Sequence, residues 1–245
     1  MNRFFLPPAS FEPDRVTFPP EVAHQMARVL RLQPGARVIA LDGSGSETLV
    51  ELMDLTPQSA WGRALERRPA PGEPGPRLWL YLGLTQREKF EWMLQKCTET
   101  GAAGFTPLIS ARSLVQRESE VLPKLERWQR IVQEAAEQSG RGLVPPVHPP
   151  LRLNAALTDA ARHGLCLLAW EEEHTVGLNA ALSAVPGQPA PHLAALIGPE
   201  GGFSAAEAAQ AVAAGVQPLT LGPRILRMET AAVVLTALVL HHFEE

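Results

Sequence analysis

The sequence predicts an α/β protein of two domains, a small antiparallel β-domain followed by a larger domain with a mostly parallel sheet. The length of 245 residues suits two domains at the usual scale of about 150 residues each. A stretch rich in proline and glycine, from Arg68 to Arg77, interrupts the chain. Before it, β-suited segments alternate with turns; after it, short apolar runs alternate with helical segments.

Composition narrows the class of protein. With 45% hydrophobic and 20% charged residues, the chain has enough apolar material for a sizeable core. No apolar run approaches the roughly 18 residues of a membrane span, and the start carries prolines and acids rather than a signal sequence, so we expect a cytoplasmic protein with no membrane partner. Cys97 and Cys166 lie among apolar neighbours, which predicts buried free thiols. The net charge of −4 argues against a surface that neutralises phosphates throughout.

The first domain is expected over residues 1–70. "PEVAHQMARVL" predicts a helix with Val22, Met26 and Val29 on one side. "ARVIALDGSGSETLVELMDLTPQSAWGRALE" follows, where Asp-Gly and Gly-Ser turns between β-suited stretches indicate a small antiparallel sheet or barrel. Residues 71–76 form the expected linker, because their prolines and glycines exclude a helix interior or central strand.

The second domain is expected over residues 77–245. "LWLYLGL" leads into a helix whose Phe90, Met93, Leu94 and Cys97 recur at helical spacing. "FTPLI" precedes a long helix from about residue 118 to 139, and "LCLLAW", "LAALI" and "QPLTLG" each precede another helical segment. This alternation is typical of a parallel sheet covered by helices.

The last helix, "METAAVVLTALVLHHF", is apolar nearly all round. It should be buried, either inside the domain or against a second subunit. His241 and His242 adjoin near its end, where neighbouring side chains diverge, so no metal site is expected.

A glycine turn runs from Gly198 to Ser204, reading G-P-E-G-G-F-S between a predicted strand and a predicted helix. Its spacing is not that of G-x-G-x-x-G, and it lacks the Gly-Lys of a phosphate loop, so no phosphate is implied. Ser204 and Glu207 suit a capping box, and alone the segment would be a plain tight turn. A second Gly-Pro turn, "LGPRILRMETA", again joins a strand to a helix, so the two turns predict opposite walls of one pocket at the carboxyl edge of the sheet.

The paired turns, "LIGPEGGFSAAE" and "LGPRILRMETA", resemble the signature of the SPOUT methyltransferases, whose carboxyl-terminal segment forms a trefoil knot. The resemblance is closest to the ribosomal RNA small-subunit methyltransferase E family, which methylates N3 of a uridine in 16S ribosomal RNA. "RFFL", "HQMARVLRLQPGARV", "KFEWMLQKCTETGA" and "EAAEQSGR" extend it along almost the whole chain. That family joins an amino-terminal PUA-like RNA-binding barrel to the knotted domain.

The resemblance implies a cofactor, S-adenosylmethionine, bound in a bent form among three knot loops. A third loop is expected around Ala169 and Trp170. The residues at matching motif positions of the other two loops are Leu196, Gly198, Glu200, Gly201, Gly202, Leu221, Gly222, Ile225, Leu226 and Thr230.

Methylation at N3 requires that the proton of this nitrogen leaves. Arg224 is the first choice, and Arg227 the second, for stabilising negative charge on the uracil oxygens, because guanidinium groups stay protonated. Glu229 and Glu200 are the carboxylates available to accept the proton or orient the base, and Glu229 is equally interpretable as a first-turn acid that interacts with its helix dipole. Glu171 to Glu173 is interpreted as a solvated loop, with Glu171 lining the pocket as the alternative.

RNA contacts are expected from both domains, with Arg3, Arg28, Arg31 and Arg141 as candidates for phosphate contacts. The near-neutral charge balance suggests modest affinity for bare RNA and recognition of the assembled small ribosomal subunit. The resemblance also implies a homodimer. Two alternatives stay open: another SPOUT activity such as ribose 2'-O methylation, and a non-catalytic RNA-binding or assembly factor.

Overall fold

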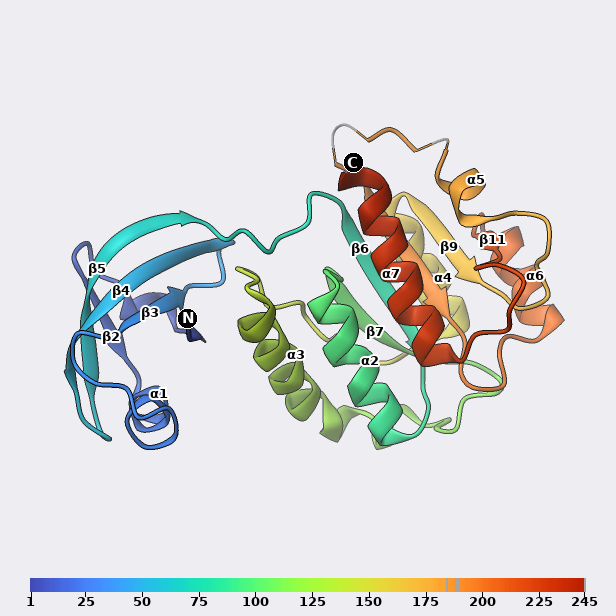
Figure 1. Cartoon of the computed structure of the whole chain (residues 1–245). Coiled ribbons are helices and arrows are strands. Elements are labelled where there is room, and N and C mark those ends of the chain that lie inside the picture. The colour runs from blue at the N-terminus through green and yellow to red at the C-terminus, as the bar shows by residue number, and fades with distance from the viewer. Residues whose placement is uncertain (184, 188–189, 245) are drawn as a thin grey trace. The chain divides into compact units, whose positions relative to one another are not determined.

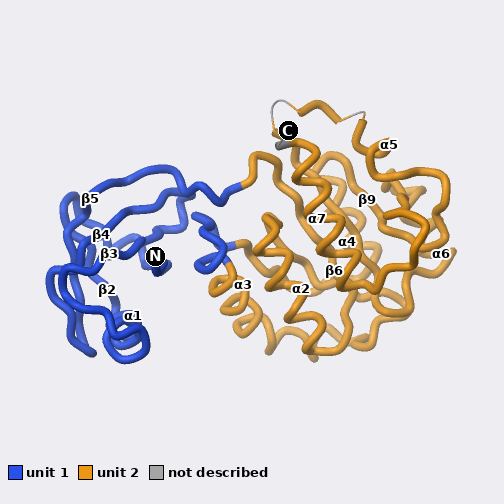
Figure 2. Tube along the Cα trace, viewed as in Figure 1, with its two compact units in different colours: residues 1–73, 136–144 blue, residues 74–135, 145–245 orange. Residues whose placement is uncertain are grey.

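The computed structural model describes residues 1–183, 185–187 and 190–244 and divides the chain into two compact units. The first unit holds residues 1–73 and 136–144, and the second holds residues 74–135 and 145–245 (Figure 2). The break between residues 73 and 74 lies inside the proline-rich stretch. Residues 136–144 also belong to the first unit, which no motif in the sequence predicts.

The first unit is built on one five-stranded sheet (Figure 1). Its order is β1-β3-β4-β5-β2, with β1 and β3 parallel and the other pairs antiparallel. The strands are β1 (Arg3–Phe5), β2 (Arg15–Phe18), β3 (Arg37–Leu41), β4 (Ser46–Leu55) and β5 (Ala60–Pro69). Register shifts in the β4–β5 pair add bends to these long strands.

A closed barrel is not formed, because β1 and β2 are the two edges of this sheet and do not pair in the part of the chain that the structure describes. One backbone donor of the short β1 bonds outside the sheet: the Phe5 N–H donates to the Glu137 carboxylate at 3.0 Å. The antiparallel sheet predicted from the turns is therefore present as an open, curved sheet.

The helix of the first unit departs from its prediction. It consists of α1 (Pro20–His24) followed by a single π-helical turn, η2 (Gln25–Val29). The Leu30 N–H bonds the Gln25 carbonyl, five residues back, at 3.0 Å. This wider turn rotates the residues that follow it away from the apolar face of the helix. Met26 is fully buried whereas Val29 is 68% exposed, so the prediction that both lie on one side is wrong.

The second unit is built on a six-stranded sheet in which every pair is parallel, as predicted. Its order is β11-β9-β10-β6-β7-β8. The strands are β6 (Arg77–Gly83), β7 (Gly104–Ile109), β8 (Leu151–Arg152), β9 (Leu165–Ala169), β10 (His192–Ile197) and β11 (Gln217–Leu219). The central strands are buried on both faces, which explains their nearly continuous apolar sequences.

Helices cover both faces of this sheet (Figure 1). On one face α4 (Leu153–Ala160) and α6 (Ala205–Ala213) pack on Tyr81, Leu168 and Leu196. On the other face α2 (Arg87–Glu99) packs against α7 (Met228–Glu244), which also contacts β6 and β10. The remaining helices are α3 (Leu125–Ser139) and α5 (Leu178–Leu182).

The predicted apolar stripe of α2 is confirmed, since its four members are at most 1% exposed. The predicted helix over 118–139 is wrong at its start, because two 3₁₀ turns, η3 (Glu118–Glu120) and η4 (Leu122–Lys124), precede α3. Pro123 has no N–H to donate and its ring crowds the preceding turn, so a continuous helix cannot run through it.

The final helix is only half buried within this chain: Ala232, Leu235 and Val239 are enclosed, whereas Leu238 is 46% exposed. Both cysteines are free and buried, as predicted. Among the described residues, no helix is long and apolar enough to cross a membrane.

Candidate active site

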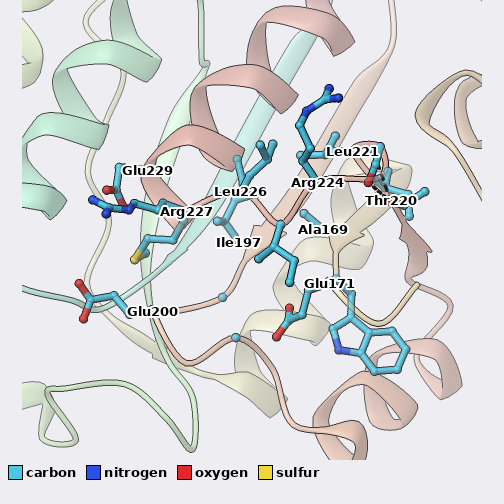
Figure 3. Close-up of a pocket in the computed structure, with 18 of the residues that line it drawn as sticks. Ala169, Glu171, Ile197, Glu200, Thr220, Leu221, Arg224, Leu226, Arg227 and Glu229 are labelled. Atoms are coloured by element: carbon cyan, nitrogen blue, oxygen red, sulfur yellow. Dashed lines mark hydrogen bonds between the residues drawn. The ribbon is translucent and has the colours of Figure 1, made fainter. Parts of the chain in front are cut away.

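A cavity of about 370 Å³ opens at the carboxyl edge of the parallel sheet, where β9, β10 and β11 end (Figure 3). Parallel strands bring their carboxyl ends to one edge, so the three following segments meet there although they are distant in sequence. The lining residues are Lys89; Ala169, Trp170, Glu171 and His174; Ile197, Gly198, Pro199, Glu200 and Gly202; Leu219 to Glu229; and Ala231.

One wall is the glycine turn after β10. The Gly202 N–H donates to the Pro199 carbonyl at 2.8 Å, and Gly202 has a φ of +66°, a conformation that favours glycine. The predicted capping box is confirmed: Ser204 Oγ accepts from the Glu207 N–H, and the Glu207 carboxylate accepts from the Ser204 N–H. The box sets the direction in which α6 leaves this wall.

The same wall is held from the ends of β6 and β7. Arg112 Nη1 donates to the Gly201 carbonyl at 2.6 Å, and the Ala111 N–H donates to Glu207 Oε1 at 2.7 Å. Burial alone raises the pKa of the Glu207 carboxyl, but the backbone N–H groups of Ala111 and Ser204, the Ser204 hydroxyl and the charge of Arg112 leave that pKa below its usual value. The carboxylate is therefore a charged anchor for the wall.

Two further contacts reach the glycine turn. Lys89 of α2 forms an ion pair with Glu200 at the pocket. Gly83, the last residue of β6, lies against the backbone of Gly198 and Pro199, because a Cβ built on Gly83 would be 2.6 Å from the Gly198 carbonyl carbon. Glycine is required there for close approach, not for an unusual backbone conformation.

The opposite wall is the segment after β11. Gly222 has a φ of +109°, and the Thr220 hydroxyl bonds both its N–H and its carbonyl. Ile225 is 88% exposed, which is unusual for so apolar a side chain. Figure 3 shows the Arg224 and Arg227 side chains leaving this segment in different directions. Within the described residues neither arginine has an ion-pair partner.

Most of the residues singled out from the sequence meet at this cavity. They are Ala169, Trp170, Gly198, Glu200, Gly202, Leu221, Gly222, Arg224, Ile225, Leu226, Arg227 and Glu229. Leu196, Gly201 and Thr230 do not line it: Leu196 is fully buried in the core beneath the wall, Gly201 is exposed beside the Arg112 side chain, and Thr230 is exposed on the first turn of α7. The assignment of the whole set to the cofactor stays a prediction.

Sequence reasoning missed several contributors. Gly83 belongs to β6, Lys89 to α2 and Arg112 to the loop after β7, which the paired turns give no reason to place here. A signal was nevertheless available, because all of them follow strands of the parallel sheet and so fall at its carboxyl edge.

The four arginines predicted to contact RNA differ in their surroundings. Arg28 and Arg31 are exposed, and no ion pair involves them among the described residues. Arg3 lies 3.7 Å from the buried Glu47 carboxylate. Arg141 is 3% exposed and pairs with Glu73 at 2.9 Å. Its guanidinium is buried within the first unit, so the predicted contact with an RNA phosphate does not fit this structure.

Comparison with known proteins decides the family. The RNA methyltransferase domain model matches residues 73–240. A ribosomal RNA small subunit methyltransferase E from Synechocystis sp. is 39% identical over 225 residues, 91% of this chain and 71% of the relative. The chain belongs to the ribosomal RNA small subunit methyltransferase E family. It is therefore an RNA methyltransferase.

Other members of this family agree over most of their length. The Bacillus subtilis protein of the same name is 33% identical over 86% of this chain and 84% of its own. The structure of the methyltransferase E from Neisseria gonorrhoeae, solved bound to S-adenosyl methionine, matches with a TM-score of 0.86 and 30% identity, covering 99% of this chain and 98% of that one. The matched methyltransferase domain contains every residue that lines the cavity.

Proposed function

We propose that this chain transfers the methyl group of S-adenosylmethionine to N3 of a specific uridine in 16S ribosomal RNA of the small subunit. The observation that carries the proposal is the meeting of two Gly-Pro turns, after β10 and after β11, around one cavity. Its relatives named ribosomal RNA small subunit methyltransferase E, and the gonococcal structure with bound cofactor, support it.

The residues of the cavity fit this cofactor. A volume of about 370 Å³ is within the range of small-molecule sites. Ile197, Leu221 and Leu226 offer apolar cover for a flat adenine ring, and Gly198 and Gly202 leave their backbone open to close approach. S-adenosylmethionine carries no phosphate, and the turns carry no phosphate-loop lysine. When bound, it supplies a methyl group on a positively charged sulfur.

Methyl transfer is an in-line displacement, so the protein must align the acceptor nitrogen with the methyl group. Negative charge spreads to the uracil oxygens as the N3 proton leaves. Arg224 and Arg227 stay protonated and have no ion-pair partner among the described residues, so they are suited to stabilise that charge.

Of the two candidate carboxylates, we favour Glu229 as the proton acceptor. Both line the cavity, but Glu200 already pairs with Lys89, whereas the described residues give Glu229 no ion pair. Glu229→Gln should lower kcat by about 100-fold, the usual scale of general-base catalysis, with the Kd for S-adenosylmethionine unchanged. An unchanged kcat would leave Glu229 only its role in the first turn of α7.

The RNA surface of the first unit centres on its helical turn. Residues 22–41 contain no acidic side chain, and Arg28 and Arg31 are exposed within that stretch. We assign phosphate contacts to these two arginines. Replacing either one should weaken binding to any RNA sequence and reduce its salt dependence.

The finer organisation follows the family. We propose a PUA-like RNA-binding domain over residues 1–70, a linker over 71–76, and a SPOUT domain over 77–245 whose last segment is tied in a trefoil knot, in a cytoplasmic homodimer. The open sheet of the first unit and the exposed Leu238 on α7 are compatible with these assignments. Light scattering at working concentration tests the dimer, and a monomeric mass would contradict it.

The proposed reaction is tested by incubating the protein with labelled S-adenosylmethionine and small ribosomal subunits, then mapping the product by mass spectrometry. One methyl group on a uracil base is expected, with weaker transfer to naked 16S RNA. Methylation of a ribose would indicate the 2'-O activity, and absence of both transfer and cofactor binding would indicate an assembly factor.

A further inference from the structure

Glu171 lies two residues after the end of β9 and brings a carboxylate into the cavity (Figure 3). This carboxylate lies against Gly202 of the glycine turn after β10, since a Cβ built on Gly202 would be 2.7 Å from Glu171 Cδ and 2.8 Å from Oε2. Any side chain at residue 202 would meet this group. Glycine at residue 202 therefore does two things: it adopts the backbone conformation of the turn, and it leaves space for the Glu171 carboxylate.

Two other carboxylates near Glu171 are already engaged. Glu200 pairs with Lys89. Glu173 accepts hydrogen bonds from the Thr175 hydroxyl and from the Thr175 and Val176 N–H groups, which lower its pKa to about 2. No hydrogen bond or ion pair involves Glu171 in the part of the chain that the structure describes.

Glu171 is exposed in the open cavity, and a ligand bound there would exclude water from its carboxylate. A cation then stabilises the carboxylate best, because attraction between opposite charges strengthens as water is excluded. The proposed cofactor carries two cationic groups, a sulfonium and an ammonium. Methyl transfer removes the first of these charges, because the bond electrons return to sulfur and leave a neutral thioether.

We infer that Glu171 is a specificity-determining residue that binds the cationic part of S-adenosylmethionine and favours it over the spent product. The inference rests on the proposed cofactor pocket. Its consequence is that the product, S-adenosylhomocysteine, loses part of its attraction to the site once the methyl group has left.

Calorimetry with Glu171→Gln tests this, because the amide keeps the shape of the side chain and removes its charge. Three ligands separate the charges: S-adenosylmethionine carries both cations, S-adenosylhomocysteine only the ammonium, and methylthioadenosine neither. The Kd for S-adenosylmethionine should rise about tenfold, the equivalent of about 1.4 kcal/mol. The Kd for S-adenosylhomocysteine should rise less, and that for methylthioadenosine should not change.

Glu172→Gln is the matched control, because Glu172 is exposed, adjacent and outside the cavity lining, and its three Kd values should equal those of the wild type. Equal losses for all three ligands in Glu171→Gln, or no loss for any, would overturn the inference. Wild-type protein that binds none of the three would instead refute the proposed cofactor pocket. A thermal melt of each variant checks that the fold is retained.

Discussion

Gly83→Ala tests whether the end of β6 sets the position of the glycine wall. A Cβ at residue 83 would lie 2.6 Å from the Gly198 carbonyl carbon and 2.8 Å from Pro199 Cδ, whereas ordinary contacts begin at 3.4 Å. The Pro199 backbone nitrogen would lie closer still, so the wall must move by at least about 0.8 Å, the difference between 3.4 and 2.6 Å. Overpacking of this kind costs about 1–3 kcal/mol of stability.

The effect on function should exceed the effect on stability. A misplacement of about 1 Å can cost on the order of 100-fold in rate, so kcat/KM should fall by about that factor. The Kd for S-adenosylmethionine should rise about tenfold, which corresponds to about 1.4 kcal/mol. Calorimetry and transfer of labelled methyl groups to small ribosomal subunits measure the two quantities.

Gly75→Ala is the matched control, because a Cβ at residue 75 meets nothing within 4 Å. It should leave both the Kd and kcat/KM at wild-type values. A Gly83→Ala protein with wild-type affinity and rate would show that the wall tolerates displacement, and the argument from close approach would be wrong.

Four further predictions follow from particular contacts. Arg112→Ala removes the hydrogen bond to the glycine wall and should raise the Kd for S-adenosylmethionine about tenfold by calorimetry, or about 1.4 kcal/mol, near the lower end of the range for one bond to a charged donor; an unchanged Kd would mean that the bond does not order the wall. Glu73→Ala leaves Arg141 buried without its carboxylate and should cost about 3–5 kcal/mol in urea unfolding, and a loss under about 1 kcal/mol would contradict that account. The pKa of Glu207 is lowered in the folded state, so its stabilisation is complete above the unfolded pKa and is lost as the pH falls through the folded value; Glu207→Gln should therefore show a shallower loss of stability than the wild type below about pH 4.5, the ordinary value for this group. Burial raises the pKa of both cysteine thiols to about 12, so a thiol reagent at pH 8 should label the unfolded chain and not the native protein.

The architecture of the second unit was predictable because its signals are local. The stripe of Phe90, Met93, Leu94 and Cys97 identifies a helix, and continuous apolar runs identify strands buried on both faces. The capping box of Ser204 and Glu207 was predictable for the same reason, since both partners lie within one turn.

Features that depend on contacts between distant segments were not predictable. The π-helical turn that exposes Val29 differs from an α-helix by one hydrogen-bond step, and nothing in the apolar spacing marks it. Arg141 has the sequence context of a surface residue, and its pairing with Glu73, 68 residues away, cannot be predicted from its neighbours in sequence.

The site shows the same division. The two Gly-Pro turns are recognisable in the sequence. The contacts that Arg112, Lys89 and Gly83 make with the glycine turn come from other segments of the chain and are not. Leu196 belongs to the same motif as Gly198, yet strand alternation directs its side chain into the core. A motif therefore identifies the segment that forms a site, and the tertiary structure decides which of its side chains reach the ligand.

A crystal structure of the protein with S-adenosylmethionine tests the central claim most directly. We expect the adenine between the glycine turn at Ile197 to Gly202 and the segment Leu221 to Leu226, with the methionine part near Glu171. A cofactor bound instead in the smaller cavity beside Arg152 and Asn154 would contradict the assignment of the site.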